Sequence, residues 1–198
     1  MKILNLYAGI GGNRALWGEE YKITAVELNK KIASKYHSLF PKDNIVIADA
    51  HEYLLDNYKK YDFIWSSPPC QSHSTTNYFT QAIRKRPIYP SMKLYEEIIF
   101  LQNFYKGKFC VENVISYYEP LIKPIKIGRH YLWANFNIPK IEQPIGEIGG
   151  MNHKEGYNIA NKKKQTQLNS TNSDLGLHVL NRAIGIVQEN KVKQQKLV

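Results

Sequence analysis

Residues 3–12, Ile-Leu-Asn-Leu-Tyr-Ala-Gly-Ile-Gly-Gly, join a short apolar run to a glycine-rich turn. The apolar run predicts a first strand at Ile3–Tyr7, because a strand that is covered on both faces shows no polar alternation. The glycines allow the backbone to turn tightly and to approach a ligand, with the amino end of a helix beyond. For this stretch alone, a turn that merely links a strand to a helix is an equally good interpretation.

Apolar runs recur along the chain with helical stretches between them, which is typical of a doubly wound α/β sheet that binds ligands at the carboxyl ends of its strands. The expected strands are Ile3–Tyr7, Ile23–Leu28, Ile45–Ala48, Phe63–Ser66, Phe109–Val114 and Tyr131–Phe136. The expected helices are Lys30–Phe40, His51–Tyr58, Met92–Tyr105 and a last helix that starts at Ser173, its expected N-cap.

The composition is that of a folded protein with a basic surface. Of its 198 residues, 43% are hydrophobic and 12% aromatic, enough for one domain with a core. The formal net charge of +10 favours a nucleic-acid partner over a merely soluble Lys-rich surface. No stretch approaches the roughly 20 apolar residues of a membrane helix. Two cysteines are too few for a disulfide framework, and no Cys/His cluster has zinc spacing, so we expect a reducing cytoplasm and no metal.

Two carboxylates end the second and third expected strands, at the same edge of the sheet as the glycine turn. Glu27 has the usual offset for an acid that binds ribose hydroxyls, and Asp49 could accept a hydrogen bond from an adenine amino group. Either acid alone could simply cap a helix. Together with the glycine turn they predict an adenosine-containing cofactor. No P-loop Lys-Ser/Thr pair follows the glycines, which argues against an NTPase.

A thiol and a second carboxylate stand at two further strand ends. Residues 66–74, Ser-Ser-Pro-Pro-Cys-Gln-Ser-His-Ser, place Cys70 where a strand gives way to a loop, and residues 111–114, Val-Glu-Asn-Val, place Glu112 at the end of the next strand. A thiolate that adds to carbon 6 of cytosine makes carbon 5 nucleophilic, while a carboxylate can hydrogen-bond to the attacked ring. Cys110 lies within a strand and is expected to be core.

At these positions the chain resembles the cytosine carbon-5 methyltransferases of DNA, as a small phage- or bacterial-type member. The resemblance covers residues 1–136 in order, with a weak further match at 180–187. The Pro-Cys-Gln and Glu-Asn-Val pair, at this spacing after the glycine turn, is strongly specific. The matching motifs are Leu6-Tyr-Ala-Gly-Ile-Gly-Gly12, Val26-Glu-Leu-Asn-Lys30, Ala48-Asp-Ala50, Pro68-Pro-Cys-Gln-Ser-His-Ser74 and Glu112-Asn-Val114.

The resemblance implies a Rossmann-like class I methyltransferase fold with S-adenosylmethionine as the methyl donor. Tyr7 would stack on the adenine, Glu27 would hold the ribose, and Asp49 would bind the adenine amino group. The cofactor-binding residues that the resemblance implies are Tyr7, Ala8, Gly9, Gly11, Gly12, Glu27, Leu28, Asp49, Ala50 and Pro68.

The resemblance also implies an enzyme that flips its target cytosine out of the duplex. Cys70 would be the nucleophile, and Glu112 would hydrogen-bond to ring nitrogen 3 and the amino group. Arg129, which matches one arginine of the family's Arg-x-Arg motif, would reach the base oxygen and help to orient Cys70. The residues expected to contact DNA are Gln71, Ser74, Arg84, Lys85, Arg86, Lys162, Lys163 and Lys164.

The target-recognition region is expected to be short. We expect a catalytic and cofactor-binding domain at 1–137, a target-recognition or loop region at 138–172, a C-terminal helix at 173–190 that returns to the catalytic domain, and a basic tail at 191–198. The family usually has a much larger recognition region. The sequence recognised in double-stranded DNA would therefore be short or loosely specified, or specificity would be supplied by a second copy or a partner protein. The alternatives are an RNA (tRNA) cytosine-5 methyltransferase and a catalytically weak binding module that needs a partner.

Overall fold

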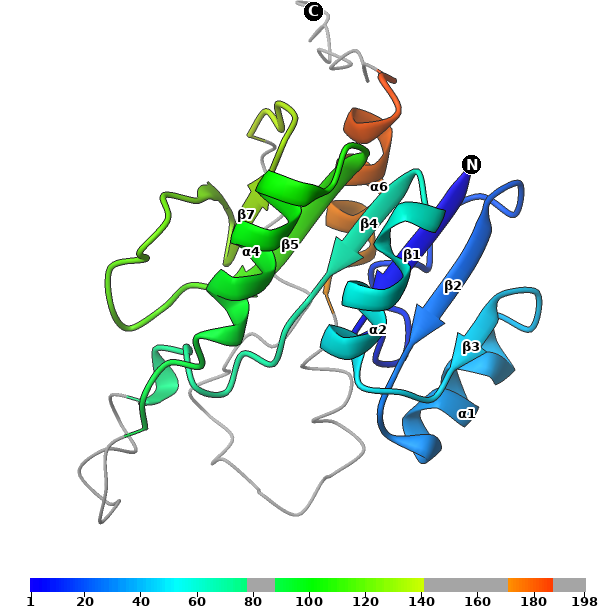
Figure 1. The fold of residues 1–198 in the computed structure, drawn as a ribbon, viewed down its shortest axis with the longest axis horizontal. Coiled ribbons are helices and arrows are strands. Elements are labelled where there is room, and N and C mark those ends of the chain that lie inside the picture. Colours follow the sequence, from blue (N-terminus) through cyan, green and yellow to red (C-terminus); the bar gives the residue numbers. More distant parts are fainter. Residues whose placement is uncertain (78–87, 141–170, 187–198) are drawn as a thin grey trace, which may run out of the picture.

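The computed structural model describes residues 1–77, 88–140 and 171–186, which form one mixed sheet with helices on both faces (Figure 1). The strands are β1 (Lys2–Leu6), β2 (Lys22–Val26), β3 (Asn44–Val46), β4 (Phe63–Ser66), β5 (Lys108–Val114), β6 (Ile125–Ile127) and β7 (His130–Ala134). Their order is β3-β2-β1-β4-β5-β7-β6, with β1 to β5 parallel and β7 antiparallel to both of its neighbours. The predicted doubly wound α/β fold is confirmed.

Two apolar faces of the sheet are covered by different helices. The helices are α1 (Lys30–Leu39), α2 (Ala50–Asn57), the short 3-10 helix η1 (Tyr58–Lys60), α4 (Lys93–Phe104) and α6 (Ser173–Ala183). Leu4 and Leu6 of β1 pack with α2 and α4, whereas Ile3 of the same strand packs with α6. Figure 1 accordingly shows α2 and α4 in front of the sheet and α6 behind it. No helix in the described part of the chain is long and apolar enough to cross a membrane.

The antiparallel edge differs from the expectation. The strand expected at Tyr131–Phe136 forms as β7, which begins one residue earlier and ends two residues earlier, and it pairs with β6 as well as with β5. The strand β6 is not among the expected strands. It has only three residues with Lys126 at its centre, and so it shows neither an apolar run nor a full alternation.

The last helix also differs from the expectation at both ends. It begins at Ser173, but its N-cap is Asn172, whose side chain accepts hydrogen bonds from two backbone N–H groups of the first turn. It ends at Ala183, short of the expected range 173–190, and Gly185 with φ of +80° follows. A residue in this left-handed conformation is a common helix stop. Residues from 187 onward lie outside the described part of the chain.

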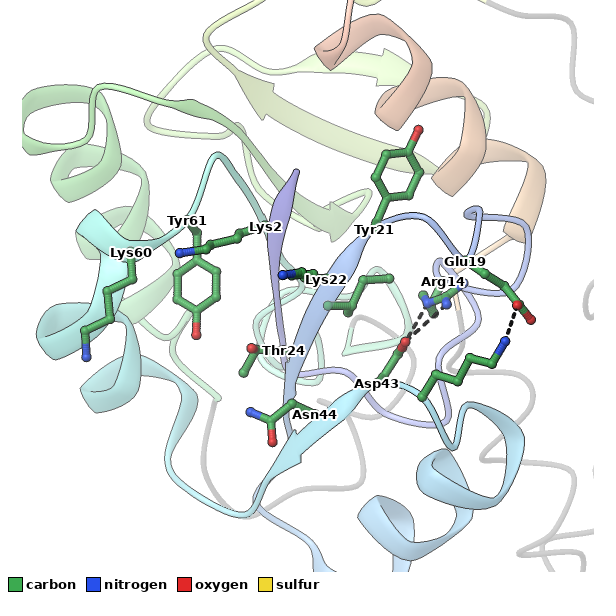
Figure 2. A pocket seen from close by; sticks show the side chains of 12 residues that line it. Lys2, Arg14, Glu19, Tyr21, Lys22, Thr24, Asp43, Asn44, Lys60 and Tyr61 are labelled. Atoms are coloured by element: carbon green, nitrogen blue, oxygen red, sulfur yellow. Dashed lines mark hydrogen bonds and ion pairs between the residues drawn. The ribbon is translucent and has the colours of Figure 1, made fainter.

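A buried ion pair joins the segment after the glycine turn to the start of β3 (Figure 2). Arg14 donates from Nε and Nη2 to the two carboxylate oxygens of Asp43, at 2.9 and 3.1 Å. Tyr36 of α1 donates its hydroxyl to the same carboxylate at 2.7 Å, and the Trp17 carbonyl accepts from the guanidinium. The two charged side chains are only 7% and 3% exposed. Because buried charges need complete pairing, this contact fixes the position of the glycine turn relative to β3.

Replacing Asp43 with Asn is expected to lower the free energy of unfolding by about 3–5 kcal/mol, because it leaves the Arg14 guanidinium buried without a counter-charge. Urea unfolding measures the loss. Glu19→Gln is the matched control, since it breaks the neighbouring Lys42–Glu19 pair, whose side chains are 73% and 74% exposed, and should leave stability nearly unchanged. Equal effects of the two substitutions would contradict this account of the buried pair.

Candidate active site

The loops after β1 to β4, together with the end of β5, line one cavity at the carboxyl ends of these strands, with a volume of about 1260 Å³. Sites for one small molecule usually measure about 300–1,000 Å³, so this cavity has room for two ligands side by side. Its place follows from the parallel strands, whose carboxyl ends meet at one edge of the sheet. The predicted site residues that line it are Tyr7, Ala8, Gly9, Gly12, Glu27, Leu28, Asp49, Ala50, Pro68, Cys70, Gln71 and Glu112.

Three further predicted site residues in the described part of the chain do not line the cavity. Gly11, with φ of +82°, is buried against aromatic rings of the α1 segment, so it serves the packing of the turn. Ser74 forms an isolated β-bridge with Ser116 beyond the end of β5. Arg129 is exposed in the turn between β6 and β7 and is not among the residues that line the cavity. The predicted DNA contacts that lie outside the described residues are Arg84, Lys85, Arg86, Lys162, Lys163 and Lys164.

The adenosine half of the cavity is built on the glycine turn and two acids. Gly9 has φ of +56°, and a Cβ atom placed on it would meet no atom within 4 Å, so the turn borders open space. Glu27 accepts hydrogen bonds from the backbone N–H of Gly9 at 3.0 Å and of Asn29 at 2.8 Å. Asp49 caps α2 through one oxygen, at 2.8 Å from the backbone nitrogen of His51. Each carboxylate keeps lone pairs for a ligand, so these residues fit an adenosine-containing cofactor.

A fully buried carboxylate, Glu97 of α4, lies beneath this half of the cavity. It accepts hydrogen bonds from the hydroxyls of Tyr7 at 2.5 Å and Ser66 at 2.6 Å, and His51 Nδ1 lies 3.2 Å away. Burial, and next the charge of Glu97, raise the pKa of Tyr7, so its hydroxyl stays a donor. The hydrogen bond to Glu97 raises the pKa of His51. The contact holds Tyr7 at φ of +54°, a conformation that is rare for a bulky residue.

Glu97 is not among the predicted site residues, although the sequence contains a signal for a buried acid at this position. It stands on the apolar face of α4, between the buried residues Leu94 and Ile98. A single acid at a core position of a helix has to be paired inside the protein, since a buried unpaired charge is too costly. Its partners could not be named from the sequence, because they come from three other elements.

The loop after β4 presents Cys70 to the cavity. Asn113 of β5 is buried, and its amide donates to the Pro68 carbonyl at 3.0 Å, which fastens the two prolines to the neighbouring strand. The backbone N–H groups of His73 and Ser74 then donate to the Cys70 carbonyl at 2.9 and 3.0 Å, which turns the chain directly after the thiol. Cys70 is half-buried as a result, whereas Cys110 is fully buried in the core, as expected.

His73 anchors the far side of this loop. Its side chain is 1% exposed, and its Nδ1 lies 2.6 Å from the hydroxyl of Tyr118. Burial lowers the pKa of His73, so the imidazole is neutral at ordinary pH. Its carbonyl also accepts from the backbone N–H of Tyr117 at 3.0 Å. The loop is thus held between β5 and the segment that follows it.

Glu112 lies across the cavity from the glycine turn and is 6% exposed. His130 Nδ1 lies 2.6 Å from one carboxylate oxygen, and the Thr171 hydroxyl donates to the other at 3.2 Å. Burial, and next the charge of Glu112, raise the pKa of Cys70, so the thiol is protonated while the cavity holds no base. Arg129 is predicted to reach the base oxygen and to help orient Cys70; its neighbour His130, which is not among the predicted site residues, is the one in contact with Glu112.

A ligand that binds at the glycine turn and its two acids would carry adenosine, and it would direct a reactive group toward the part of the cavity that Cys70 lines. S-adenosylmethionine meets both requirements, and the fold and the site together define a Rossmann-like methyltransferase that uses this cofactor. The model of one such family, the C-5 cytosine-specific DNA methylase, matches residues 1–118. The chain belongs to this family, which confirms the resemblance of its motifs.

This chain spans well under half the length of the three similar proteins described next. A tRNA (cytosine(38)-C(5))-methyltransferase of Spodoptera frugiperda is 37% identical over 76 residues, which are 35% of this chain and 23% of that protein. A crystal structure of a DNMT2 mutant of Spodoptera frugiperda is 27% identical, with a TM-score of 0.40, over 57% of this chain and 35% of that one. A SAM-dependent methyltransferase of Agrobacterium tumefaciens is 13% identical, with a TM-score of 0.44, over 60% of this chain and 40% of that one.

The reactivity of Cys70 in the ligand-free protein is expected to depend on Glu112. Alkylation by iodoacetamide should begin only above the ordinary thiol range, and Glu112→Gln should move its midpoint to lower pH, because removal of the negative charge favours the thiolate. Mass spectrometry of the alkylated peptides at each pH measures the midpoint. The buried Cys110 should stay unmodified and serves as the internal control for folding. An unchanged or higher midpoint in Glu112→Gln would show that the carboxylate does not act on the thiol.

Proposed function

We propose that this protein methylates carbon 5 of cytosine in DNA, through a covalent adduct between Cys70 and carbon 6 of a flipped-out base. The observation that carries the proposal is that Cys70 and Glu112 line the same cavity as the glycine turn. Membership of the C-5 cytosine-specific DNA methylase family supports it, and so does the net charge of +10, which suits a phosphate backbone.

In the proposed reaction, the Cys70 thiolate adds to carbon 6 and the electron pair of the 5,6 double bond moves toward carbon 5. S-adenosylmethionine would supply an electrophilic methyl group: carbon 5 would take up this group as its bond to the sulfonium sulfur breaks, and S-adenosylhomocysteine would leave. The proton on carbon 5 then leaves to solvent, and the re-formed double bond expels the Cys70 sulfur as thiolate. Glu112 would accept a hydrogen bond from the amino group of the base, and from ring nitrogen 3 once the adduct carries a proton there, and would so stabilise the adduct.

Base binding would itself activate the nucleophile. In the empty cavity the charge of Glu112 opposes ionisation of Cys70. A cytosine placed between the two groups would engage the carboxylate through its amino group and so weaken this opposition. The thiolate would therefore form when a target base is in place, which limits side reactions of a free thiolate.

The cofactor would lie along the glycine turn, with its ribose at Glu27 and its adenine amino group at Asp49. Support comes from the lone pairs that both acids keep after their backbone contacts and from the open space at Gly9. We further propose that residues 1–137 form the catalytic part and that α6 returns to it. Thr171 before α6 contacts Glu112, and Gly176 on α6 packs so closely on the Asn13 backbone that a Cβ atom would clash.

The nature of the nucleic acid has a second candidate. The relative from Spodoptera frugiperda is named as a tRNA methyltransferase, so an RNA cytosine-5 methyltransferase of the same mechanism is the alternative. Specificity for double-stranded DNA would come from residues 138–172, from a second copy or from a partner protein. A reducing cytoplasm of a bacterial or phage-infected cell suits the proposal, because the nucleophile is a free thiol.

Expression in cells without cytosine methylation, followed by mass spectrometry of nucleosides from DNA and from RNA, tests the proposal. The wild-type protein is expected to produce 5-methylcytosine in DNA, and Cys70→Ala is expected to produce none while it still binds S-adenosylmethionine. Cys110→Ala is the matched control, since it removes the other cysteine and should retain the mark. Detection of 5-methylcytosine in RNA alone would establish the alternative substrate. Folded protein that leaves no mark in either pool, or an active Cys70→Ala, would contradict the proposal.

A further inference from the structure

His130 is aimed at Glu112 by the pairing of β7 with β5. The register places His130 opposite Val114 and Leu132 opposite Glu112, so all four side chains lie on one face of the sheet. Glu112 is the diagonal neighbour of His130, and a long side chain can reach such a neighbour. The imidazole Nδ1 lies 2.6 Å from the carboxylate oxygen Oε1.

We propose that His130 is the positioning residue for Glu112, the residue that fixes how this carboxylate is presented to the base in the cavity. The proposal rests on the proposed function. The role differs from the one that the motif implies for Arg129, which is to reach the base oxygen and to orient Cys70; Arg129 is exposed in the turn before β7.

The need for such a residue follows from the side-chain chemistry of glutamate. The last torsion of a glutamate is broad and roughly two-fold, so the plane of an isolated carboxylate is poorly defined. An ionised carboxylate can only accept hydrogen bonds. Nδ1 of His130 is therefore the donor in its contact with Glu112. The His130 and Thr171 contacts occupy one site on each oxygen. Of about four lone-pair sites on a carboxylate, the remaining ones are left for the amino group of the base, which donates, and for ring nitrogen 3 once it carries a proton.

His130 is the stronger of the two partners of Glu112. Its contact is 2.6 Å, whereas the Thr171 hydroxyl donates over 3.2 Å. Short distances are characteristic of hydrogen bonds to ionised acceptors. The His130 side chain is 18% exposed and that of Glu112 is 7% exposed, so little water is available to replace the bond if it is lost.

The same contact bears on the nucleophile. A donor on Oε1 draws the negative charge of Glu112 toward β7, and this charge is one of the two causes that oppose ionisation of Cys70. Removal of the donor would leave the whole charge acting on the thiol. His130 thus affects two measurable properties, turnover and the reactivity of Cys70, and the second needs no nucleic acid.

The first experiment compares His130→Ala with His130→Asn in methyl transfer to the nucleic acid that the wild-type protein modifies. Ala removes the donor, and kcat is expected to fall about 10- to 100-fold, as for loss of a hydrogen bond to a charged group, with the KM for S-adenosylmethionine unchanged. The Asn amide nitrogen stands on the same branch atom as Nδ1, so it should restore most of kcat. His37→Ala, on the exposed face of α1, is the matched control and should keep wild-type kinetics.

The second experiment measures alkylation of Cys70 against pH in the ligand-free variants. His130→Ala should move the midpoint to higher pH than in the wild type, and His130→Asn should move it back. Wild-type kcat and midpoint in His130→Ala would overturn the proposal. So would an equal loss of kcat in Ala and Asn with an unchanged midpoint, which is the pattern of a merely structural residue. If the wild-type protein transfers no methyl group, the proposed function fails, and the alkylation midpoints alone then decide the role of His130.

Discussion

A carboxylate that is taken out of water must have hydrogen-bond partners inside the protein, and this constraint shapes the whole catalytic edge of the sheet. Glu97 draws its partners from β4, from α2 and from the residue after β1, and Glu112 draws its partners from β7 and from the segment before α6. The partners are remote in sequence, so each acid closes a long loop of chain. The cavity keeps its shape because these two acids would otherwise be buried without partners.

The same acids set the chemistry of the cavity. Glu97 supports the glycine turn from below through Tyr7, on the cofactor side. Glu112 stands on the side of Cys70, where burial and next the charge of Glu112 raise the pKa of the thiol, which in the proposed reaction stays protonated until a base arrives. A methyl donor on one side and a target base on the other would meet above the loop that carries Cys70. The division of the cavity into two halves thus follows from the two buried carboxylates.

The sequence predicts those parts of the site that depend on local order along the chain. Glu27, Cys70 and Glu112 stand at strand ends, and parallel strands bring such positions to one edge, so their meeting could be foreseen. His130 could not, because its contact depends on the register of β7, and a shift of one residue would place Arg129 there instead. Glu97 is buried on the apolar face of α4, and its burial is explained by hydrogen-bond partners that are remote in sequence.

The central claim is that Cys70 forms a covalent bond to carbon 6 of cytosine. The most direct measurement is the intact mass of the protein after incubation with S-adenosylmethionine and an oligonucleotide that carries 5-fluorocytosine, whose fluorine cannot leave as a proton does. The account predicts a mass increase of one oligonucleotide plus one methyl group, located by peptide mapping at Cys70. Absence of an adduct, or an adduct that persists in Cys70→Ala, would contradict it.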